Sequence, residues 1–174
     1  MNHNSSNDNL SNHNLSNDNL SNDNFKYASE INNLIETCKD GQKGFDEAAK
    51  RAESSSVQSL FRDFSHQRAQ FAQELQTELT NMGVKPTDTG SVAGSIHRGW
   101  IDIRSMLPTS HDHAIVAEAE RGEDYAKTAY EKVQLLDLPP SLKGIVDRQA
   151  AQVFEAHNKV REMKHSDRPE SMIA

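Results

Sequence analysis

Five polar residues lie within or at the edge of otherwise apolar helical stripes, and their types are the ones in this chain best suited to chemistry. They are Gln42, Arg68, Glu123, Gln149 and His157. Glu123 lies in the segment AEAERGEDYAKTAY (residues 117–130), near the edge of the face that its small and apolar residues form. A carboxylate there is costly unless a cation or a hydrogen-bond donor pairs with it. Carboxylates and imidazoles are also metal ligands. The set could therefore form a hydrogen-bonded layer or a metal site.

Four amphipathic segments must position these residues. Apolar residues at helical spacing predict helices over about residues 29–53, 54–83, 110–136 and 139–165. The first segment contains Asp40-Gly41, which usually favours a turn, and Gly44. The apolar stripe after these glycines is in phase with the stripe before them, so we predict one unbroken helix and a close-packing role for the glycines. A run of serines at residues 54–56 supplies the turn and N-cap of the second helix.

The connection between the second and third helices, residues 84–110, is too long for a hairpin between neighbouring helices. Its apolar residues are helically spaced, which predicts a short crossing helix over about residues 92–106. Trp100 would anchor that helix to the bundle, and a dimer contact is the alternative. Helices joined by short, long and short connections predict an all-α four-helix bundle with one long crossover.

The helix lengths also predict that four of these polar residues, Gln42, Arg68, Glu123 and Gln149, share one level. Counting back from the turn near residue 54 places Gln42 beside Arg68. Counting back from the turn near residue 138 places Glu123 within about a turn of Gln149. His157 lies at the edge of its helix face. We therefore predict a hydrogen-bonded layer in which Arg68 pairs with Glu123 and the two glutamines satisfy the remaining groups.

Four stretches carry a resemblance to a known family. They are INNLIETCKDGQKGF, the crossover sequence GSIHRGW, the segment ERGEDYAKTAY, and the late helix with Gln149 and His157. From about Ile31 to Lys164 the chain resembles a bacterial family of ferritin-like four-helix bundles named only as a domain of unknown function. The resemblance implies the ferritin-like fold and a frequent association with stress. It implies no established reaction and no catalytic residue.

Metal chemistry is the alternative that this fold raises. Ferritin-like di-metal proteins use a Glu from two helices and Glu-x-x-His from the other two. This layer has one carboxylate and a permanent arginine cation, which repels metal ions, so we expect no cofactor. A weak iron site using Glu120, Glu123 and His157 remains the alternative, with help from Glu36 or Glu47 if the first helix broke at Gly41. His111 and His113 flank Asp112, but residues two apart do not share a helix face, so no metal clip is expected there.

Composition narrows the location and the partners. The chain has 174 residues, a net charge of −7 and no basic run, which argues against a nucleic-acid partner. No apolar run approaches ~18 residues, and the N-terminus has no signal pattern, so we expect a cytoplasmic protein without a membrane span. The single cysteine, Cys38, fits a reducing compartment and a buried apolar role.

The bundle domain is predicted to span residues 26–166. Residues 1–25 repeat the unit Ser-Asn-Asp/His-Asn-Leu/Phe four times. Because a five-residue period never places its apolar residues on one helix face, we expect a disordered Asn-rich tail. A second disordered tail is expected at residues 167–174.

Three functional hypotheses follow. The first is a non-enzymatic, stress-associated bundle that acts by self-association or through a protein partner. The second is a metal-dependent oxidase or iron-handling protein that uses Glu120, Glu123 and His157. The third is a small-ligand pocket beneath the crossover, near His97, Arg98 and Trp100.

Overall fold

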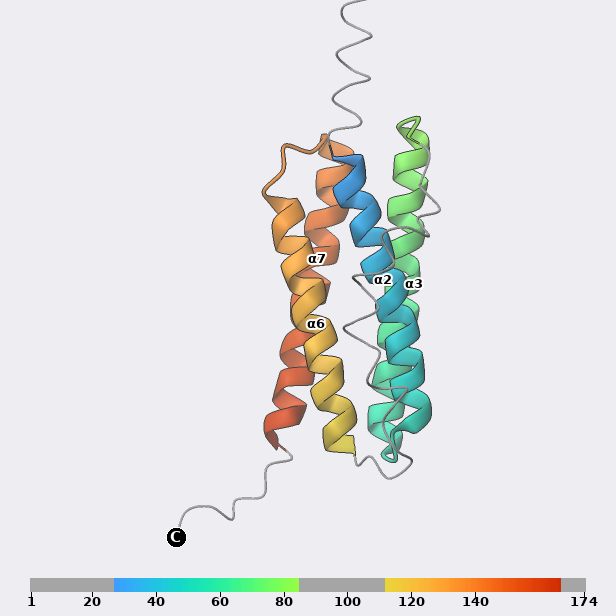
Figure 1. Cartoon of the computed structure of the whole chain (residues 1–174), viewed down its shortest axis with the longest axis vertical. Helices are drawn as coiled ribbons and strands as arrows, with labels where there is room; N and C mark the ends of the chain where they lie inside the picture. The colour runs from blue at the N-terminus through green and yellow to red at the C-terminus, as the bar shows by residue number, and fades with distance from the viewer. Residues whose placement is uncertain (1–26, 85–111, 167–174) are drawn as a thin grey trace, which may run out of the picture.

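Four long helices make up the part of the chain that the structure, a computed structural model, describes: residues 27–84 and 112–166. They are α2 (Ala28–Arg51), α3 (Ser55–Asn81), α6 (Asp112–Gln134) and α7 (Pro140–Ser166). α2 and α3 form one antiparallel hairpin, and α6 and α7 form the other (Figure 1). The predicted all-α bundle is confirmed. The proposed tails, the crossing helix and the crossover residues His97, Arg98 and Trp100 lie outside the described residues.

The first predicted helix is unbroken, and Gly41 within it packs closely against α3. α2 continues through Gly41 and Gly44, both of which are buried. A Cβ atom added at Gly41 would lie 3.3 Å from Cγ of Arg68. The missing side chain therefore lets the stem of a large α3 residue pass close to the α2 backbone.

The ends of α3 are formed in two ways. At its C-terminus, Gly83 adopts a left-handed φ of 76°, which ends the helix as glycine commonly does. At its N-terminus, Ser54 occupies the N-cap position as predicted, but its side chain makes no capping hydrogen bond. Instead, the carboxylate of Asp112 accepts hydrogen bonds from the backbone N–H groups of Glu53 (2.7 Å) and Ser54 (2.9 Å). The start of α6 is thereby held against the α2–α3 turn.

The apolar core of the described residues is divided into two clusters, and the division falls at one level in every helix. On α3 it lies between Phe64 and Phe71, and on α6 between Ala119 and Ala126. Arg68 and Glu123 lie at the middle of these two gaps. The polar residues therefore separate the two halves of the core.

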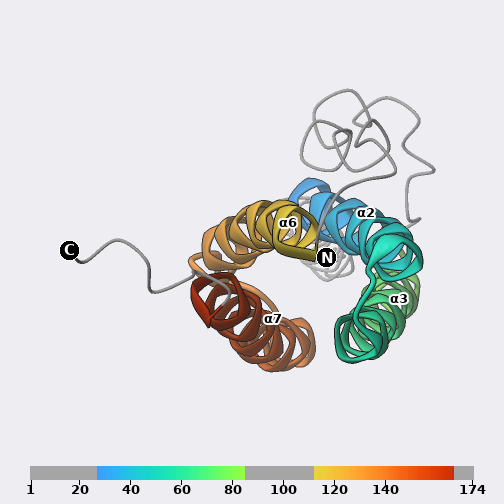
Figure 2. The ribbon, with the colours of Figure 1, turned by 90° about the horizontal axis from the view of Figure 1, so that it is seen from below.

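The helices form a ring in which α2 contacts both α3 and α6, while α3 and α7 lie at the far edges of the two hairpins (Figure 2). Among the described residues, none of the helices combines the length and the apolar character needed to cross a membrane.

Candidate functional site

An ion pair between α3 and α6 occupies the centre of the bundle. Nη2 of Arg68 donates to both carboxylate oxygens of Glu123, at 2.8 and 2.7 Å. Each side chain is 1% exposed. The sequence placed Glu123 at the edge of its helix face, whereas the structure buries it fully. The pairing itself agrees with the prediction from the helix levels.

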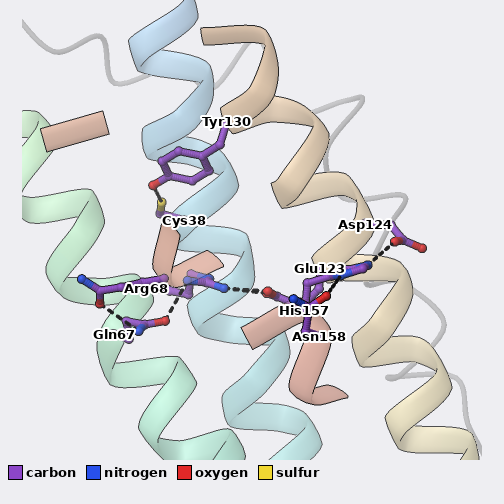
Figure 3. Close-up of polar contacts among 9 residues, drawn as sticks. Cys38, Gln67, Arg68, Glu123, Asp124, Tyr130, His157 and Asn158 are labelled. Carbon is purple, nitrogen blue, oxygen red and sulfur yellow. Dashed lines mark hydrogen bonds and ion pairs between the residues drawn. The ribbon is translucent and has the colours of Figure 1, made fainter. Parts of the chain in front are cut away.

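The remaining guanidinium contacts of Arg68 are weaker. Nη1 donates to the side-chain oxygen of Gln67 at 2.9 Å (Figure 3). The guanidinium carbon lies 5.9 Å from the Phe45 ring centroid and 5.5 Å from that of Phe71, within cation–π range. Within the described part of the chain, Nε is a buried atom without a hydrogen-bond partner. Arg68 is therefore held mainly by its ion pair with Glu123, and the side chains of Phe45 and Phe71 beside it are apolar.

Burial and pairing act on the two charges in opposite directions. Burial raises the pKa of the Glu123 carboxyl above its ordinary value, and the Arg68 guanidinium opposes that rise. Burial acts to lower the pKa of Arg68, but the charge of Glu123 and the hydrogen bonds to it together outweigh burial, and the pKa is raised. Arg68 thus stays a cation, and Glu123 depends on it for the stability of its charged form.

A second polar network joins all four helices next to this pair. The Tyr130 hydroxyl donates to Oε1 of Gln149 at 2.8 Å and lies 3.2 Å from Sγ of Cys38. Nε2 of Gln149 donates to Oε2 of Glu74 at 2.7 Å. Burial raises the pKa of Tyr130 well above its ordinary value and that of the Cys38 thiol to about 11. Both groups are therefore neutral and unreactive in the closed bundle.

His157 is buried, 6% exposed, but its hydrogen bonds point away from the ion pair. Its Nε2 lies 2.7 Å from Oδ1 of Asp124, and its Nδ1 lies 3.4 Å from Oδ1 of Asn158 (Figure 3). The Asp124 side chain is 65% exposed. His157 is therefore buried as predicted, but its hydrogen bonds join it to Asp124 and Asn158 and not to the other residues of the predicted layer.

The prediction that Gln42 belongs to the buried layer is wrong. Its side chain is exposed, and only its backbone carbonyl contributes, by accepting a hydrogen bond from Oγ of Ser65 at 2.9 Å. The inward position on α2 belongs to Gly41, which makes room for Arg68. The glutamine that contacts Arg68 is Gln67, which is partly buried and also donates to Gln152 of α7 at 3.1 Å.

The residues proposed for the weak iron site do not fit a metal. Each has another partner: Glu120 pairs with Lys164, Glu123 with Arg68, and His157 with Asp124. Across residues 27–84 and 112–166, no three His, Cys, Asp or Glu side chains are grouped so that they could hold an ion. Glu36 and Glu47, the auxiliary candidates, pair with lysines of their own helix at 2.9 and 3.2 Å. The donor set that ferritin-like metal centres need is not assembled by these side chains.

The sequence model of the domain of unknown function DUF2383 matches residues 26–134, which is more than half of the chain. The chain belongs to this family. The matched part contains α2, α3 and α6, and with them both partners of the central ion pair. No curated protein matches the chain significantly.

A solved structure shares the fold of the DUF2383 chain. It is a two-domain protein from Anabaena variabilis that contains DJ-1/ThiJ/PfpI-like and ferritin-like domains. The superposition has a TM-score of 0.68 with 12% sequence identity, and it covers 87% of this chain and 42% of the other. The chain thus spans less than half the length of that protein. At this identity the likeness concerns the fold alone, and the bundle is ferritin-like.

Proposed function

We propose that this chain is a non-enzymatic, stress-associated bacterial bundle that acts in the cytoplasm by self-association or by binding a protein partner, and that its polar layer works without a metal. The observation that carries the proposal is the Arg68–Glu123 pair, buried at mid-bundle with 1% of each side chain exposed. Ferritin-like metal proteins build their centre from side chains that project into the bundle core. In this bundle the permanent cation of Arg68 occupies that interior position and pairs with Glu123, the carboxylate at the centre.

The association part of the proposal is supported by two exposed side chains, one on α6 and one directly after its end. Tyr125 is 45% exposed and Leu135 is 87% exposed, and they are the large hydrophobic residues that the described surface leaves open. The stress association is supported by the family resemblance. The free, buried thiol of Cys38 is compatible with the reducing compartment that we propose.

The metal-free layer is tested by iron loading. Protein purified from iron-fed cells is expected to contain substoichiometric iron and to consume no oxygen when ferrous iron is added. Glu123→Gln and His157→Ala should leave the iron content unchanged. About two irons per chain, lost in these variants, would overturn the proposal and establish the iron-handling alternative.

The association mode is tested by sedimentation over a wide concentration range. We expect a concentration-dependent mass for self-association, reduced by Leu135→Ser or Tyr125→Ser, with Thr128→Ser on α6 as a control. If the chain stays monomeric and captures no protein from cells under stress, association is not its mode of action.

A further inference from the structure

The seam between α3 and α7 is the weakest boundary of the described bundle. Of the four helix pairs that pack side by side, this pair packs least closely, and each helix is packed more firmly within its own hairpin. Viewed along the bundle, α3 and α7 face each other at the edge opposite the α2–α6 contact (Figure 2). The two hairpins are thus held together mainly through α2 and α6.

Polar side chains bridge this seam. The Glu74 carboxylate of α3 pairs with Arg148 of α7 and also accepts the hydrogen bond from Gln149. About two helical turns before Glu74 on α3, Gln67 donates to Gln152 of α7 at 3.1 Å. Contacts of this kind can be exchanged for contacts with water at a small net cost, unlike the burial of apolar side chains.

The Glu74 bridge is also the outer end of a hydrogen-bonded path into the core. The exposed fraction falls from 52% for the Arg148 side chain and 35% for Glu74 to 0% for Gln149. The path then continues through Tyr130, which is 0% exposed, to Cys38, which is 1% exposed. Every step of this path is a direct contact between neighbouring helices.

We propose that Glu74, Arg148 and Gln149 form a latch that closes the α3–α7 seam, and that release of this latch opens the bundle locally and admits solvent to Cys38. The opening is a local, sub-global motion in which the hairpins separate at this edge while the α2–α6 contact holds. Cys38 is the single cysteine of the chain, so its reactivity reports on the motion without a label.

The test is the rate at which an aromatic disulfide reagent, 5,5′-dithiobis(2-nitrobenzoate), reacts with the folded full-length chain. The Cys38 thiolate attacks the reagent disulfide, forms a mixed disulfide and releases one coloured thiolate, which is followed by absorbance. In the closed state the thiol is buried and its pKa is raised to about 11, so reaction requires opening. Glu74→Ala removes the acceptor of both latch contacts and should speed the reaction about tenfold or more. Arg148→Ala should speed it less, because the Gln149 bond remains.

A matched control lies on the other inter-hairpin contact. Lys132 of α6 pairs with Glu30 of α2 at 2.8 Å, also at the surface. Glu30→Ala should leave the rate of thiol reaction unchanged. If Glu30→Ala and Glu74→Ala accelerate the reaction equally, the seam is not the route and the proposal is wrong.

Local opening must also be separated from global unfolding. For each variant the rate is measured in low concentrations of urea together with the free energy of unfolding. A latch predicts a rate that depends little on urea, because local opening exposes little surface. The latch would be overturned if the reaction rate rose with urea as steeply as global unfolding does. In that case the acceleration in each variant would be no larger than its loss in free energy of unfolding explains.

Discussion

Replacing Arg68 by methionine should destabilise the bundle severely, because it leaves a buried carboxylate without its cation. Both oxygens of Glu123 accept their hydrogen bonds from the same nitrogen of Arg68. Removing one partner of a buried pair costs about 3–5 kcal/mol. A domain of this kind is stable by only about 5–15 kcal/mol in total. Arg68→Met should therefore lower the urea midpoint markedly, as measured by helical circular dichroism.

The double variant Arg68→Met with Glu123→Leu should recover most of this loss. Phe45 and Phe71 already face the guanidinium, so an apolar side chain at position 68 would gain contacts with them. Apolar replacement of a whole buried pair is often neutral or stabilising by about 1–4 kcal/mol. The double-mutant cycle should then show a coupling energy on the order of 3 kcal/mol or more. Losses that simply add would show that the two side chains do not meet in solution.

The pH dependence of Arg68→Met provides an independent check. Burial raises the pKa of Glu123, and in this variant the opposing guanidinium is gone. A carboxyl whose folded pKa is raised stabilises the fold below its unfolded pKa and loses that contribution as pH rises through the folded value. The penalty should thus be largest near neutral pH and should shrink as pH falls toward the ordinary value of 4.5. The further change Glu123→Gln should remove this dependence, and a penalty that is constant with pH would refute the reasoning.

Three further predictions concern other parts of the bundle. Gly41→Ala should cost about 1–3 kcal/mol by overpacking, since its Cβ would lie 3.3 Å from Cγ of Arg68, less up to ~1 kcal/mol gained in helix propensity. Denaturation in the Arg68→Ala background, which removes Cγ and Cδ, should show this cost relieved, and an equal cost there would contradict the overpacking. Asp112→Ala should cost about 1.5–3 kcal/mol by removing the charged acceptor of two turn amides, with faster amide exchange at residues 53 and 54; unchanged exchange would mean that the clamp does not form. Partial burial acts to raise the pKa of Glu74, but hydrogen bonds from Arg148 and Gln149 outweigh it and the pKa is lowered. Its stabilisation should therefore be complete above pH 4.5 and be lost as pH falls through the lower folded value, and Glu74→Gln should abolish that part of the acid dependence.

The fold could be read from the sequence because helical periodicity survives local interruptions. The two glycines of α2 suggested a turn, yet the apolar residues on either side kept one phase, and the helix runs unbroken from Ala28 to Arg51. Phase is a property of the whole segment, whereas a turn signal is a property of two residues. In α2 the apolar periodicity of the whole segment, and not the two-residue turn signal, predicted the structure correctly.

The centre of the site was accessible from helix lengths, while its surroundings were not. Counting residues from the turns placed Arg68 at the level of Glu123. Gln42 was wrongly included because its neighbour Gly41 has no side chain to mark the inward direction, so the face was misjudged by one residue, about 100°.

Glu74 and Asp112 were missed because their partners come from other segments. Glu74 lies between the apolar stripe and the exposed face of its own helix, and only α7 reveals its role. Asp112 accepts hydrogen bonds from backbone amides of a turn far away in the sequence. Because nearly every residue has a backbone amide, the sequence does not show which of them an acid will bind. An acidic residue next to an apolar stripe was the one signal for Glu74 that the sequence offered.

The polar layer is best understood as a device that fixes how the two hairpins align. The clusters above and below it consist mainly of aliphatic and aromatic residues, and because apolar burial is non-directional it does not by itself select one alignment. The polar layer does select one alignment, because Arg68 reaches Glu123 only when α3 and α6 are level. Likewise, Gln149 reaches both Tyr130 and Glu74 only when α7 is level with α3 and α6. A wrong alignment would leave these groups buried and unpaired, at a cost far above that of imperfect apolar packing. We infer that the Arg68–Glu123 pair gives this bundle its single register, a role that in ferritin-like metal proteins would fall to ligands converging on the metal.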